Sequence, residues 1–362
     1  MEKVFKIFAI NPGSTSTKVA IYENEKLIDE TAVSHAGHDS AYGGDVREQV
    51  EAKKKDIEAY LTEHGYKVSD FDALAVRGGS RGKWKAGACK VTKKLSDDCF
   101  GNGKAVHPSS MGPIIGYDWS EQYGIPAYNY DVVHVFELWA KSVLSGVKDV
   151  DRTVGCHTLN TKAVARLEAK KLGKTYEECK FVIIHMGGGI EVSLHYNGRI
   201  VDGFARDEGA MSPVSSGYVK TEYGVQLGLE KNMSPVDVRN YLGNRCGFIS
   251  HLGTTDCQEV EKMIADGDKY AELVYNTMAY QIGKNIGAMA AAANGQVDAI
   301  IFTGGIANSK MLIENISQYC SWIAPVVVYP GSYEMEALGM GILRVLRGEE
   351  AVNDYSEVIT ED

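Results

Sequence analysis

Three short glycine- and hydroxyl-rich segments carry the residues of this chain best suited to binding phosphate. They are residues 11–18 (NPGSTSTK), 185–189 (HMGGG) and 302–309 (FTGGIANS). Glycines let the backbone approach an anionic ligand, and hydroxyl and N–H groups donate to its oxygens. Taken singly, the first is also compatible with a hairpin turn, the second with a bulge or a barrel-like corner, and the third with a strand–helix connector. Taken together they predict a nucleotide site, although the GxxxxGK[ST] spacing of a Walker A loop is absent. The residues expected at the nucleotide are Asn11, Ser14, Ser16, Lys18, Gly187, Gly188, Gly189, Gly304, Gly305, Ile306 and Asn308.

The elements that must position these segments form a repeated pattern. Strands are predicted around the first turn at residues 3–10, 17–22 and 27–33. The same order of strands recurs around the second turn, at residues 181–185, 191–196 and 200–204. Asn197-Gly198, between the last two, is a strong hairpin signal. Two copies of one unit, about 180 residues apart, indicate an internal duplication with one copy per domain.

Further segments complete an α/β pattern. Strands are predicted at residues 73–76, 127–130, 299–302 and 325–329, and helices at 269–293, from about 309, and at about 333–347. The boundary is expected near Asp151, with a first domain at residues 1–150 and a second at 151–334. The last helix, about 335–362, is expected to return to the first domain, on the strength of the resemblance described below.

Composition places the chain among ordinary globular proteins. Its 362 residues are 44% hydrophobic, and the formal net charge of -10 disfavours nucleic acid and anionic membranes as partners. No run of 18 apolar residues occurs, and the alternating start predicts a strand and not a signal peptide. Seven scattered cysteines without a CxxC favour reduced thiols, a cytoplasmic location and no structural zinc.

The order and spacing of its motifs show that the chain resembles the acetate and butyrate kinase family over nearly its whole length. The motifs are residues 10–18, 76–79 (VRGG), 105–107 (AVH), 130–131 (YD), 157–166 (HTLNTKAVAR), 185–192, 197–202 (NGRIVD), 208–209, 252–256 (LGTTD), 302–309, 327–331 (VVYPG) and 334–338 (EMEAL). The last of these, with the region of Tyr280-Gln281, is more similar to butyrate kinases than to acetate kinases.

This resemblance implies a fold and a reaction. The fold would be two duplicated actin-like ATPase (ribonuclease H-like) domains with an interdomain nucleotide cleft. The reaction would be reversible transfer of phosphate from ATP to a short- or branched-chain carboxylate, giving ADP and an acyl phosphate. ATP and Mg²⁺ would be the cofactors, and a homodimer is expected from the family.

The resemblance also implies roles for single side chains around the acceptor and the metal. Arg77 would bind the carboxylate, because a guanidinium can clamp it through two parallel hydrogen bonds. Asp131 would orient the site or the hydrated Mg²⁺, and Asn11 and Glu334 would lie at the metal. By residue type alone, Arg77 is also compatible with a structural role, and the acidic residues with surface positions.

Three histidines and one aspartate are assigned in the same way. His107 and His157 would donate to phosphoryl oxygens, although satisfied core histidines remain an open alternative at both positions. His185 would support its glycine turn. Asp256, together with Gly305-Ile306, would contact the ribose and adenine.

Two departures from the family pattern bear on catalysis. Ser215 falls where the family carries a second catalytic arginine, and loss of that cation would cost several kcal/mol of transition-state stabilisation. Arg206 falls where acetate kinases place a proline of the acyl pocket, so we predict that it supplies the missing charge. Glu191 replaces a small polar residue and puts negative charge near the phosphate turn, which is unfavourable unless it is paired.

The expected acyl pocket is defined by Gly79, Val106 and Cys156. Gly79 and Cys156 replace a valine and a phenylalanine that the resemblance assigns to acetate kinases, which predicts room for an acid longer than acetate. Because Ser215 is anomalous, two alternatives stay open. One is a non-catalytic nucleotide-binding paralogue, and the other is a kinase for a different carboxylic acid.

Overall fold

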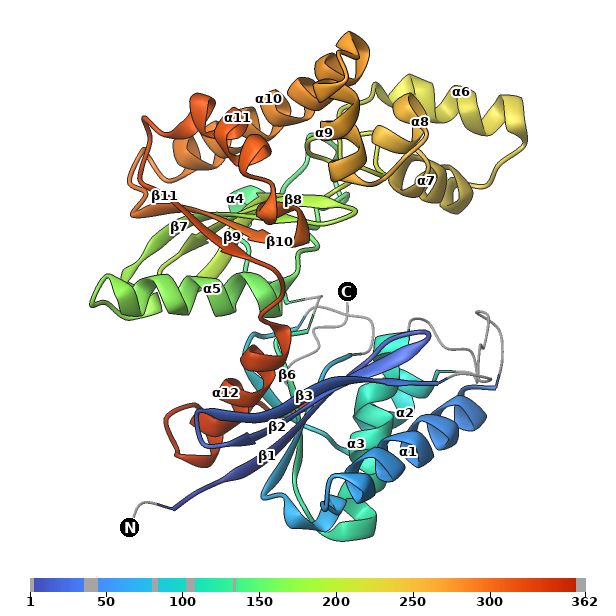
Figure 1. Ribbon diagram of the computed structural model, residues 1–362, viewed down its shortest axis with the longest axis vertical. Helices are drawn as coiled ribbons and strands as arrows, with labels where there is room; N and C mark the ends of the chain where they lie inside the picture. The colour runs from blue at the N-terminus through green and yellow to red at the C-terminus, as the bar shows by residue number, and fades with distance from the viewer. Residues whose placement is uncertain (1–2, 36–44, 80–83, 102–107, 133–134, 356–362) are drawn as a thin grey trace. The chain divides into compact units, whose positions relative to one another are not determined.

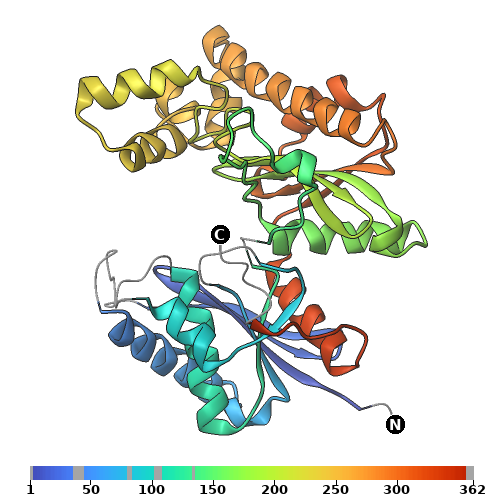
Figure 2. The ribbon, with the colours of Figure 1, turned by 180° about the vertical axis from the view of Figure 1, so that it is seen from behind.

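The computed structural model describes residues 3–35, 45–79, 84–101, 108–132 and 135–355. The chain forms two compact units: unit 1 comprises residues 1–136 and 333–362, and unit 2 comprises residues 137–332. Each unit contains one β-sheet covered by helices (Figures 1 and 2). The sequence places the first boundary near Asp151, and the compact units divide between Phe136 and Glu137.

Unit 1 is built on a six-stranded mixed sheet. In sheet order its strands are β3 (Lys26–Ser34), β2 (Ser16–Glu23), β1 (Lys6–Pro12), β4 (Ala73–Val76), β6 (Ala127–Tyr130) and β5 (Ala88–Lys90). Strands β1, β2 and β3 are antiparallel neighbours, whereas β1, β4 and β6 run parallel. Strands β1 and β4 are almost wholly buried, which explains their continuous apolar sequences.

Helices cover both faces of this sheet. They are α1 (Val46–Glu63), α2 (Lys93–Phe100), α3 (Met111–Tyr123) and α12 (Glu334–Leu346). Helices α1 and α3 share one apolar core with Phe8 and Ile10 of β1. Helix α12 lies on the opposite face, where Gly339 packs so closely on the Tyr22 ring that a Cβ atom would come within 2.6 Å of it. The C-terminal helix is therefore an integral part of the unit that the N-terminus begins.

Unit 2 repeats the same arrangement of strands. In sheet order they are β11 (Val326–Pro330), β10 (Ala299–Gly304), β7 (Lys180–Met186), β8 (Ile190–Tyr196) and β9 (Arg199–Phe204). As in unit 1, three antiparallel strands are followed by two strands that run parallel to the first, of which only one is its direct neighbour. The internal duplication inferred from the turns is thus visible as matching sheet topology.

Unit 2 has helices on both faces of its sheet and further helices beside the sheet (Figure 1). They are α4 (Ala140–Val143), α5 (Thr158–Lys171), α6 (Thr221–Lys231), α7 (Pro235–Asn244), α8 (Phe248–Leu252), α9 (Cys257–Ala265), α10 (Lys269–Ala292) and α11 (Lys310–Cys320). Helix α5 packs on one face, along β7 and β10, while α10 and α11 bury their apolar sides on the other (Figure 1). The first turn of α5 therefore lies close to the ends of β7 and β10, where the glycine turns are.

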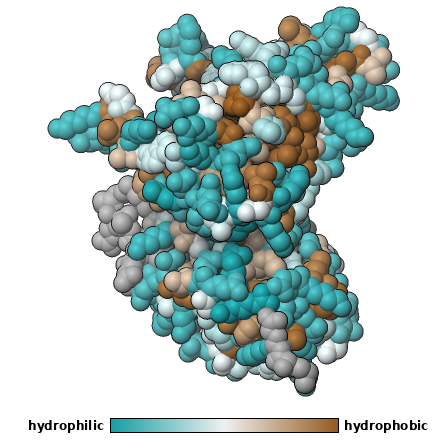
Figure 3. Space-filling view, turned by 90° about the vertical axis from the view of Figure 1, so that its left-hand side faces the viewer, coloured by the Kyte–Doolittle hydropathy of each residue, from teal (hydrophilic) through white to brown (hydrophobic). Residues whose placement is uncertain are grey.

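The surface is mainly hydrophilic, with apolar residues gathered on part of unit 2 (Figure 3). Among the exposed apolar residues of unit 2 are Trp322 and Val328 of the edge strand β11. All seven cysteines are free thiols. None of the helices within the described residues is long and apolar enough to cross a membrane.

Leu338 provides a test of how strongly α12 holds unit 1 together. Its side chain is fully buried, so Leu338→Ala should destabilise unit 1 by about 2–5 kcal/mol, from lost transfer energy plus the cavity left behind. The measurement is native-state hydrogen exchange at the β1 amides. Glu336→Ala, at an exposed position of the same helix, should change the free energy by no more than about 0.5 kcal/mol. A loss below about 1 kcal/mol for Leu338→Ala would show that α12 is dispensable.

Candidate active site

The first glycine turn joins β1 to β2 in unit 1. The Gly13 N–H donates to the Ser16 carbonyl oxygen at 2.8 Å, and a Cβ atom on Gly13 would lie 2.8 Å from that same oxygen. Only glycine therefore fits this position. Ser14 and Lys18 are exposed and Ser16 is half-buried, so their polar groups are open to a ligand.

A buried cation supports this turn from helix α1. The Lys53 ammonium donates to the Gly13 carbonyl oxygen at 2.9 Å, and burial lowers the pKa of Lys53 to about 8, against the opposing effect of Asp56. His35 joins the same support, because its ring contacts the Thr17 hydroxyl at 2.7 Å and Asp56 at 2.8 Å. The turn is therefore anchored to α1 by polar contacts as well as by packing.

Asn11, Arg77 and Glu334 meet where β1 and β4 end and α12 begins. Arg77 Nη1 donates to Glu334 Oε2 at 2.9 Å and to Asn11 Oδ1 at 3.4 Å, and Asn11 Nδ2 donates to the same Glu334 oxygen at 3.1 Å. The Arg77 and Glu334 side chains are only 19% and 12% exposed. Arg77 Nε is buried and has no hydrogen-bond partner within the described part of the chain. Three predicted site residues are thus brought together, with donor capacity left on the guanidinium.

The backbone around Arg77 is held by close approaches that exclude side chains. A Cβ atom on Gly112 would lie 2.0 Å from the Arg77 carbonyl oxygen, so the first turn of α3 can pack against the end of β4 only through glycine. Asn129 of β6 donates to the Gly78 carbonyl oxygen at 2.7 Å. These contacts fix the direction in which the Arg77 side chain leaves the sheet.

Asp131 follows β6 and is 2% exposed, in a left-handed backbone conformation with φ of 40°. Its Oδ1 accepts a hydrogen bond from the Gly87 N–H at 2.8 Å. The aspartate is thus held rigidly at a strand end, as a residue that orients a site should be. His107 and Val106, also predicted for the site, lie outside the described residues.

In unit 2, the second glycine turn connects β7 to β8. The Gly187 N–H donates to the Gly189 carbonyl oxygen at 2.9 Å, and the Gly188 carbonyl oxygen accepts from the Ser212 hydroxyl at 2.7 Å. Gly188 is exposed, and its N–H has no hydrogen-bond partner among the residues that the structure describes. The Ser212 contact therefore holds the turn in place, and the Gly188 N–H is left as a donor on the exposed side.

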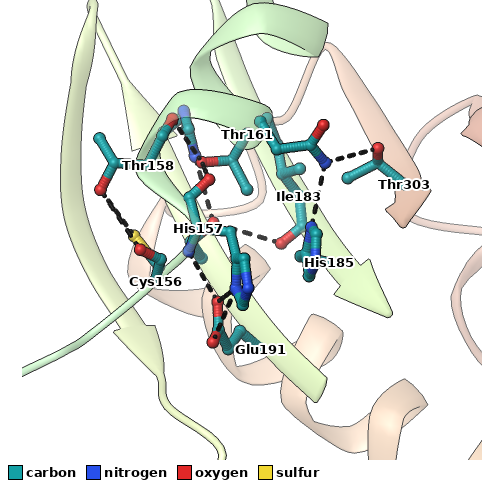
Figure 4. A network of polar contacts seen from close by, with 11 residues as sticks. Cys156, His157, Thr158, Thr161, Ile183, His185, Glu191 and Thr303 are labelled. Carbon is teal, nitrogen blue, oxygen red and sulfur yellow. Dashed lines mark hydrogen bonds and ion pairs between the residues drawn. The ribbon is translucent and has the colours of Figure 1, made fainter. Parts of the chain in front are cut away.

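His157 precedes α5 and lies beside this turn (Figure 4). Its backbone N–H donates to Glu191 Oε2 at 2.8 Å, and its Nδ1 lies 3.0 Å and 3.1 Å from the two carboxylate oxygens. The ring stacks on His185 with 3.9 Å between centroids and 7° between planes. The His157 side chain is 41% exposed, whereas that of Glu191 is 10% exposed. Glu191, expected to be unfavourable unless paired, is therefore paired.

His185 is fixed in turn by Asn160. Asn160 Nδ2 lies 3.0 Å from His185 Nδ1 and 2.9 Å from the Thr303 hydroxyl of β10. Asn160 itself is fully buried. One amide thus joins the first turn of α5 to the ends of β7 and β10, next to two of the three predicted phosphate segments.

The third glycine turn differs in detail from the expected strand–turn–helix. Gly304 has φ of 91°, and a Cβ atom there would lie 2.3 Å from the Met186 carbonyl oxygen. A 3₁₀ turn, Gly305–Asn308, follows before Ser309 caps α11. The glycines therefore do not themselves form the N-terminus of α11. Asp256 caps α9 through the Gln258 N–H at 2.9 Å.

Ser215 and Arg206 differ in their surroundings: Ser215 is buried, whereas Arg206 is exposed. Ser215 is 1% exposed, and its hydroxyl lies 2.7 Å from that of Ser212, so its position offers no room for an outward cation. The Arg206 side chain is exposed and crosses over Gly189, whose Cβ atom would lie 3.1 Å from Arg206 Cδ. Within the described residues, the Arg206 guanidinium has no ion-pair or hydrogen-bond partner, and it lies against Gly243, whose Cβ atom would be 3.2 Å from Nη2.

The two described residues of the expected acyl pocket belong to different units. In unit 1, a Cβ atom on Gly79 would lie 3.0 Å from Val132 Cγ1, so little space is open there without movement of Val132. In unit 2, Cys156 is 4% exposed, and burial raises the pKa of its thiol to about 12. Cys156 is thus a neutral packing residue beside His157.

Curated proteins similar to this chain over its whole length are butyrate kinases. A protein of Caldanaerobacter subterraneus subsp. tengcongensis named "Probable butyrate kinase 2" is 40% identical over 97% of this chain and 100% of that protein. Butyrate kinase 2 of Clostridium acetobutylicum is 37% identical over 97% of this chain and 99% of that protein. The sequence profile of the Acetokinase family matches residues 144–322.

The chain belongs to the acetokinase family. Solved structures agree with the predicted fold. The acetate kinase of Porphyromonas gingivalis has a TM-score of 0.77 at 17% identity, covering 94% of this chain and all of that one. The acetate kinase of Entamoeba histolytica has a TM-score of 0.74 at 15% identity, covering 93% and 98%. These kinases have the actin-like ATPase-type fold, so the predicted fold class is confirmed. The predicted family is confirmed by the relatives named above.

Sequence reasoning missed several residues that shape this acetokinase-family site. Asn160 and Ser212 bond to residues that are distant in sequence, and neither belongs to a glycine turn. Asn160 does lie within the HTLNTKAVAR motif, and that placement was the only available signal. Lys53 gave no signal, because a lysine on a charged helix is usually solvated.

Lys53 predicts a pH dependence of stability. Its folded-state pKa of about 8 lies below the ordinary lysine value of 10.5, so between these pH values the unfolded chain binds more protons than the folded one. The free energy of unfolding of the wild type, relative to Lys53→Met, should therefore rise from pH 8 to pH 10. Urea denaturation at successive pH values measures this difference. Lys55→Met, at an exposed position of the same helix, should show no such slope, and a flat Lys53→Met difference would contradict the prediction.

Proposed function

We propose that this chain is an ATP-dependent carboxylate kinase whose best acceptor is butyrate or a similar short- or branched-chain acid. The observation that carries the proposal is the Arg77 cluster: a guanidinium with an unused buried donor, beside a carboxylate and an amide, at the end of β4. The named relatives, similar over the whole chain, are butyrate kinases, which supports butyrate as the acid.

The acceptor needs binding more than activation. A carboxylate is already ionised near neutral pH, so no strong general base is required. In the proposed reaction a carboxylate oxygen forms a bond to the γ-phosphorus of ATP, the bond from that phosphorus to the β,γ-bridging oxygen breaks, and ADP leaves with its electron pair. Arg77 would clamp the acceptor and neutralise its charge as it approaches the phosphoryl group.

Mg²⁺ fits the donors present in unit 1. Magnesium is usually held by one or two carboxylates together with water and substrate phosphates, so it needs no cage of protein ligands. Glu334 offers carboxylate oxygens and Asn11 an amide oxygen, and Asn11 Nδ2 donates to Glu334 Oε2 at 3.1 Å. When bound, the ion would neutralise charge on the nucleotide phosphates. Glu334 and Asn11 would hold the ion, and Arg77 Nε, a buried donor without a partner in the described part of the chain, would be available to the acceptor.

The nucleotide would be held mainly by unit 2. The outward N–H of Gly188 and the small residues at Gly304-Gly305 suit phosphate oxygens, and Asp256 is exposed for a ribose hydroxyl. The imidazole of His157 would contact the transferring phosphoryl group. His107 is proposed for the same role on the family pattern, and the first turn, with Ser14, Ser16 and Lys18, would add donors in unit 1.

The anomaly at Ser215 keeps a kinase for another acid, or a nucleotide-binding paralogue without catalysis, as the second candidate. Ser215 is buried and hydrogen-bonded to Ser212, so the serine is built into the structure and is not a vacant arginine position. A cytoplasmic homodimer is proposed from the family pattern alone.

A panel of acids tests the kinase proposal and its preferred substrate. With ATP and Mg²⁺, kcat/KM should rise from acetate through propionate to butyrate or isobutyrate, by about fourfold for each methylene at roughly 0.8 kcal/mol. Acyl phosphate is measured by trapping with hydroxylamine. Arg77→Lys should lower kcat/KM about 100-fold, because the two-pronged contact is lost. Arg47→Lys, at an exposed arginine of unit 1, serves as the control.

The panel distinguishes the two ways in which the proposal can fail. An enzyme that prefers acetate, or that uses only hydroxylated or dicarboxylic acids, contradicts butyrate but not the reaction class. A wild-type chain that phosphorylates no acid contradicts the kinase itself. Gly79→Ala is the better probe of the acyl pocket, since a valine there would collide with Val132.

Arg206 is tested as the source of the missing charge. If its guanidinium stabilises the transferring phosphoryl group, Arg206→Ala should lower kcat about 100-fold with little change in KM for ATP. Arg239→Ala, at an exposed arginine on α7, should leave kcat unchanged. An Arg206→Ala enzyme with wild-type kcat would remove Arg206 from the mechanism. Ser215→Arg is a poorer test, because it would bury a cation and break the contact to Ser212.

A further inference from the structure

We infer that Glu191 is a positioning residue that fixes the His157 ring and lets it act as a cation on the transferring phosphoryl group. The inference rests on the proposed kinase function and assigns a source for positive charge in unit 2. It arises from the two departures found in the sequence: an arginine is missing at Ser215, and a carboxylate is added at Glu191.

The first step is the placement of the carboxylate. Glu191 is the second residue of β8 and pairs in register with His185 of β7, so both side chains project from the same face of the hairpin. That face meets the start of α5, where His157 lies. A carboxylate that is only 10% exposed needs a partner, and Glu191 accepts from both the backbone N–H and the ring of His157.

The second step is the position of the ring proton. A carboxylate only accepts hydrogen bonds, so Nδ1 of His157, which lies 3.0 Å and 3.1 Å from its two oxygens, must carry a proton. The nitrogen across the ring, Nε2, is then a donor only when the ring is cationic. A neighbouring carboxylate favours that cationic form, and a donating Nε2–H is what an anionic phosphoryl oxygen requires.

The third step assigns a single charge to the stacked pair. Asn160 Nδ2 donates to His185 Nδ1, so this ring accepts at Nδ1 and is neutral. Two imidazolium rings stacked at 3.9 Å would repel each other, which favours one charge, and Glu191 places it on His157. His185 therefore serves as a flat neutral support beneath a charged ring.

The remaining charged and titratable groups near His157 do not oppose this assignment. On β7 and β8 these are His185 and Glu191 themselves. In the preceding segment, Cys156 holds its proton, with a thiol pKa raised by burial to about 12. From α5, the Lys162 ammonium is neutralised by Glu137 at 2.9 Å. The His157 ring is 41% exposed, so a phosphoryl group can reach it.

Nuclear magnetic resonance of the wild-type protein tests the inference without any assay of activity. In protein labelled with ¹⁵N-histidine, the His157 signals, identified by their loss in His157→Gln, should show both ring nitrogens protonated at pH 7.5, and those of His185 only one. In Glu191→Gln the His157 ring should be neutral at that pH. A neutral His157 ring in the wild type would overturn the inference, even if the chain proves to be a carboxylate kinase.

Kinetics provide the second arm. Glu191→Gln keeps the shape of the side chain, and kcat should fall by about 10- to 100-fold at pH 7.5 while KM for ATP changes less than about twofold. Activity of this variant should recover toward pH 6, where an imidazole without a carboxylate partner is largely protonated. Glu191→Asp, which retains the charge, should recover more of kcat than Glu191→Gln, and Glu222→Gln, at an exposed site, should match the wild type.

The outcomes separate this inference from the proposed function. A purely structural role for Glu191 would lower stability and activity equally at all pH values, without recovery in acid, and would overturn the inference. If the wild type makes no acyl phosphate from any acid, the proposed function fails, while the protonation measurement still decides whether Glu191 holds a charged His157.

Discussion

In each unit a nearly buried carboxylate lies against a nitrogen-bearing side chain at the end of the sheet, and we infer above that the one in unit 2 is cationic. In unit 1 the pair is Glu334 with Arg77, and in unit 2 it is Glu191 with His157. A charge taken out of water must be matched nearby, so these carboxylates determine where the cations lie before any ligand arrives. The pair in unit 1 lies where β1 and β4 end and α12 begins, and the pair in unit 2 lies where α5 and β8 begin.

This arrangement has a consequence for ligand binding. A cation already held by a carboxylate is oriented without the entropy cost of ordering a long side chain at the moment of binding. The same pairing means that a ligand must compete with the carboxylate or take over its partner. In unit 2 the Glu191 carboxylate contacts only Nδ1 of the His157 ring, so a ligand at Nε2 would leave this pair intact.

The sequence predicted the elements better than the contacts between them. Strands at 73–76 and 127–130 and the long helix beginning at residue 269 were placed within a residue or two, because buried strands and an alanine-rich helix carry strong local patterns. The glycine turns were located because glycine and hydroxyl residues gather at strand ends. Glu191 was judged unfavourable, since its partner His157 is distant along the chain and only the folded hairpin brings them together. The family pattern indicated that an arginine is missing at Ser215, whereas the structure shows a buried serine in contact with Ser212.

The place of α12 has a consequence for how the chain is made. Unit 2 is one continuous stretch of sequence, but unit 1 needs both the first 136 residues and a segment beginning at Tyr333. On a ribosome, which delivers the chain from its N-terminus, unit 2 can be complete while unit 1 still lacks the helix that covers one face of its sheet. Glu334 is the first residue of that helix. The cluster of Arg77, Asn11 and Glu334 is therefore among the last parts of the protein to form, and the uncovered sheet face is open to aggregation until then.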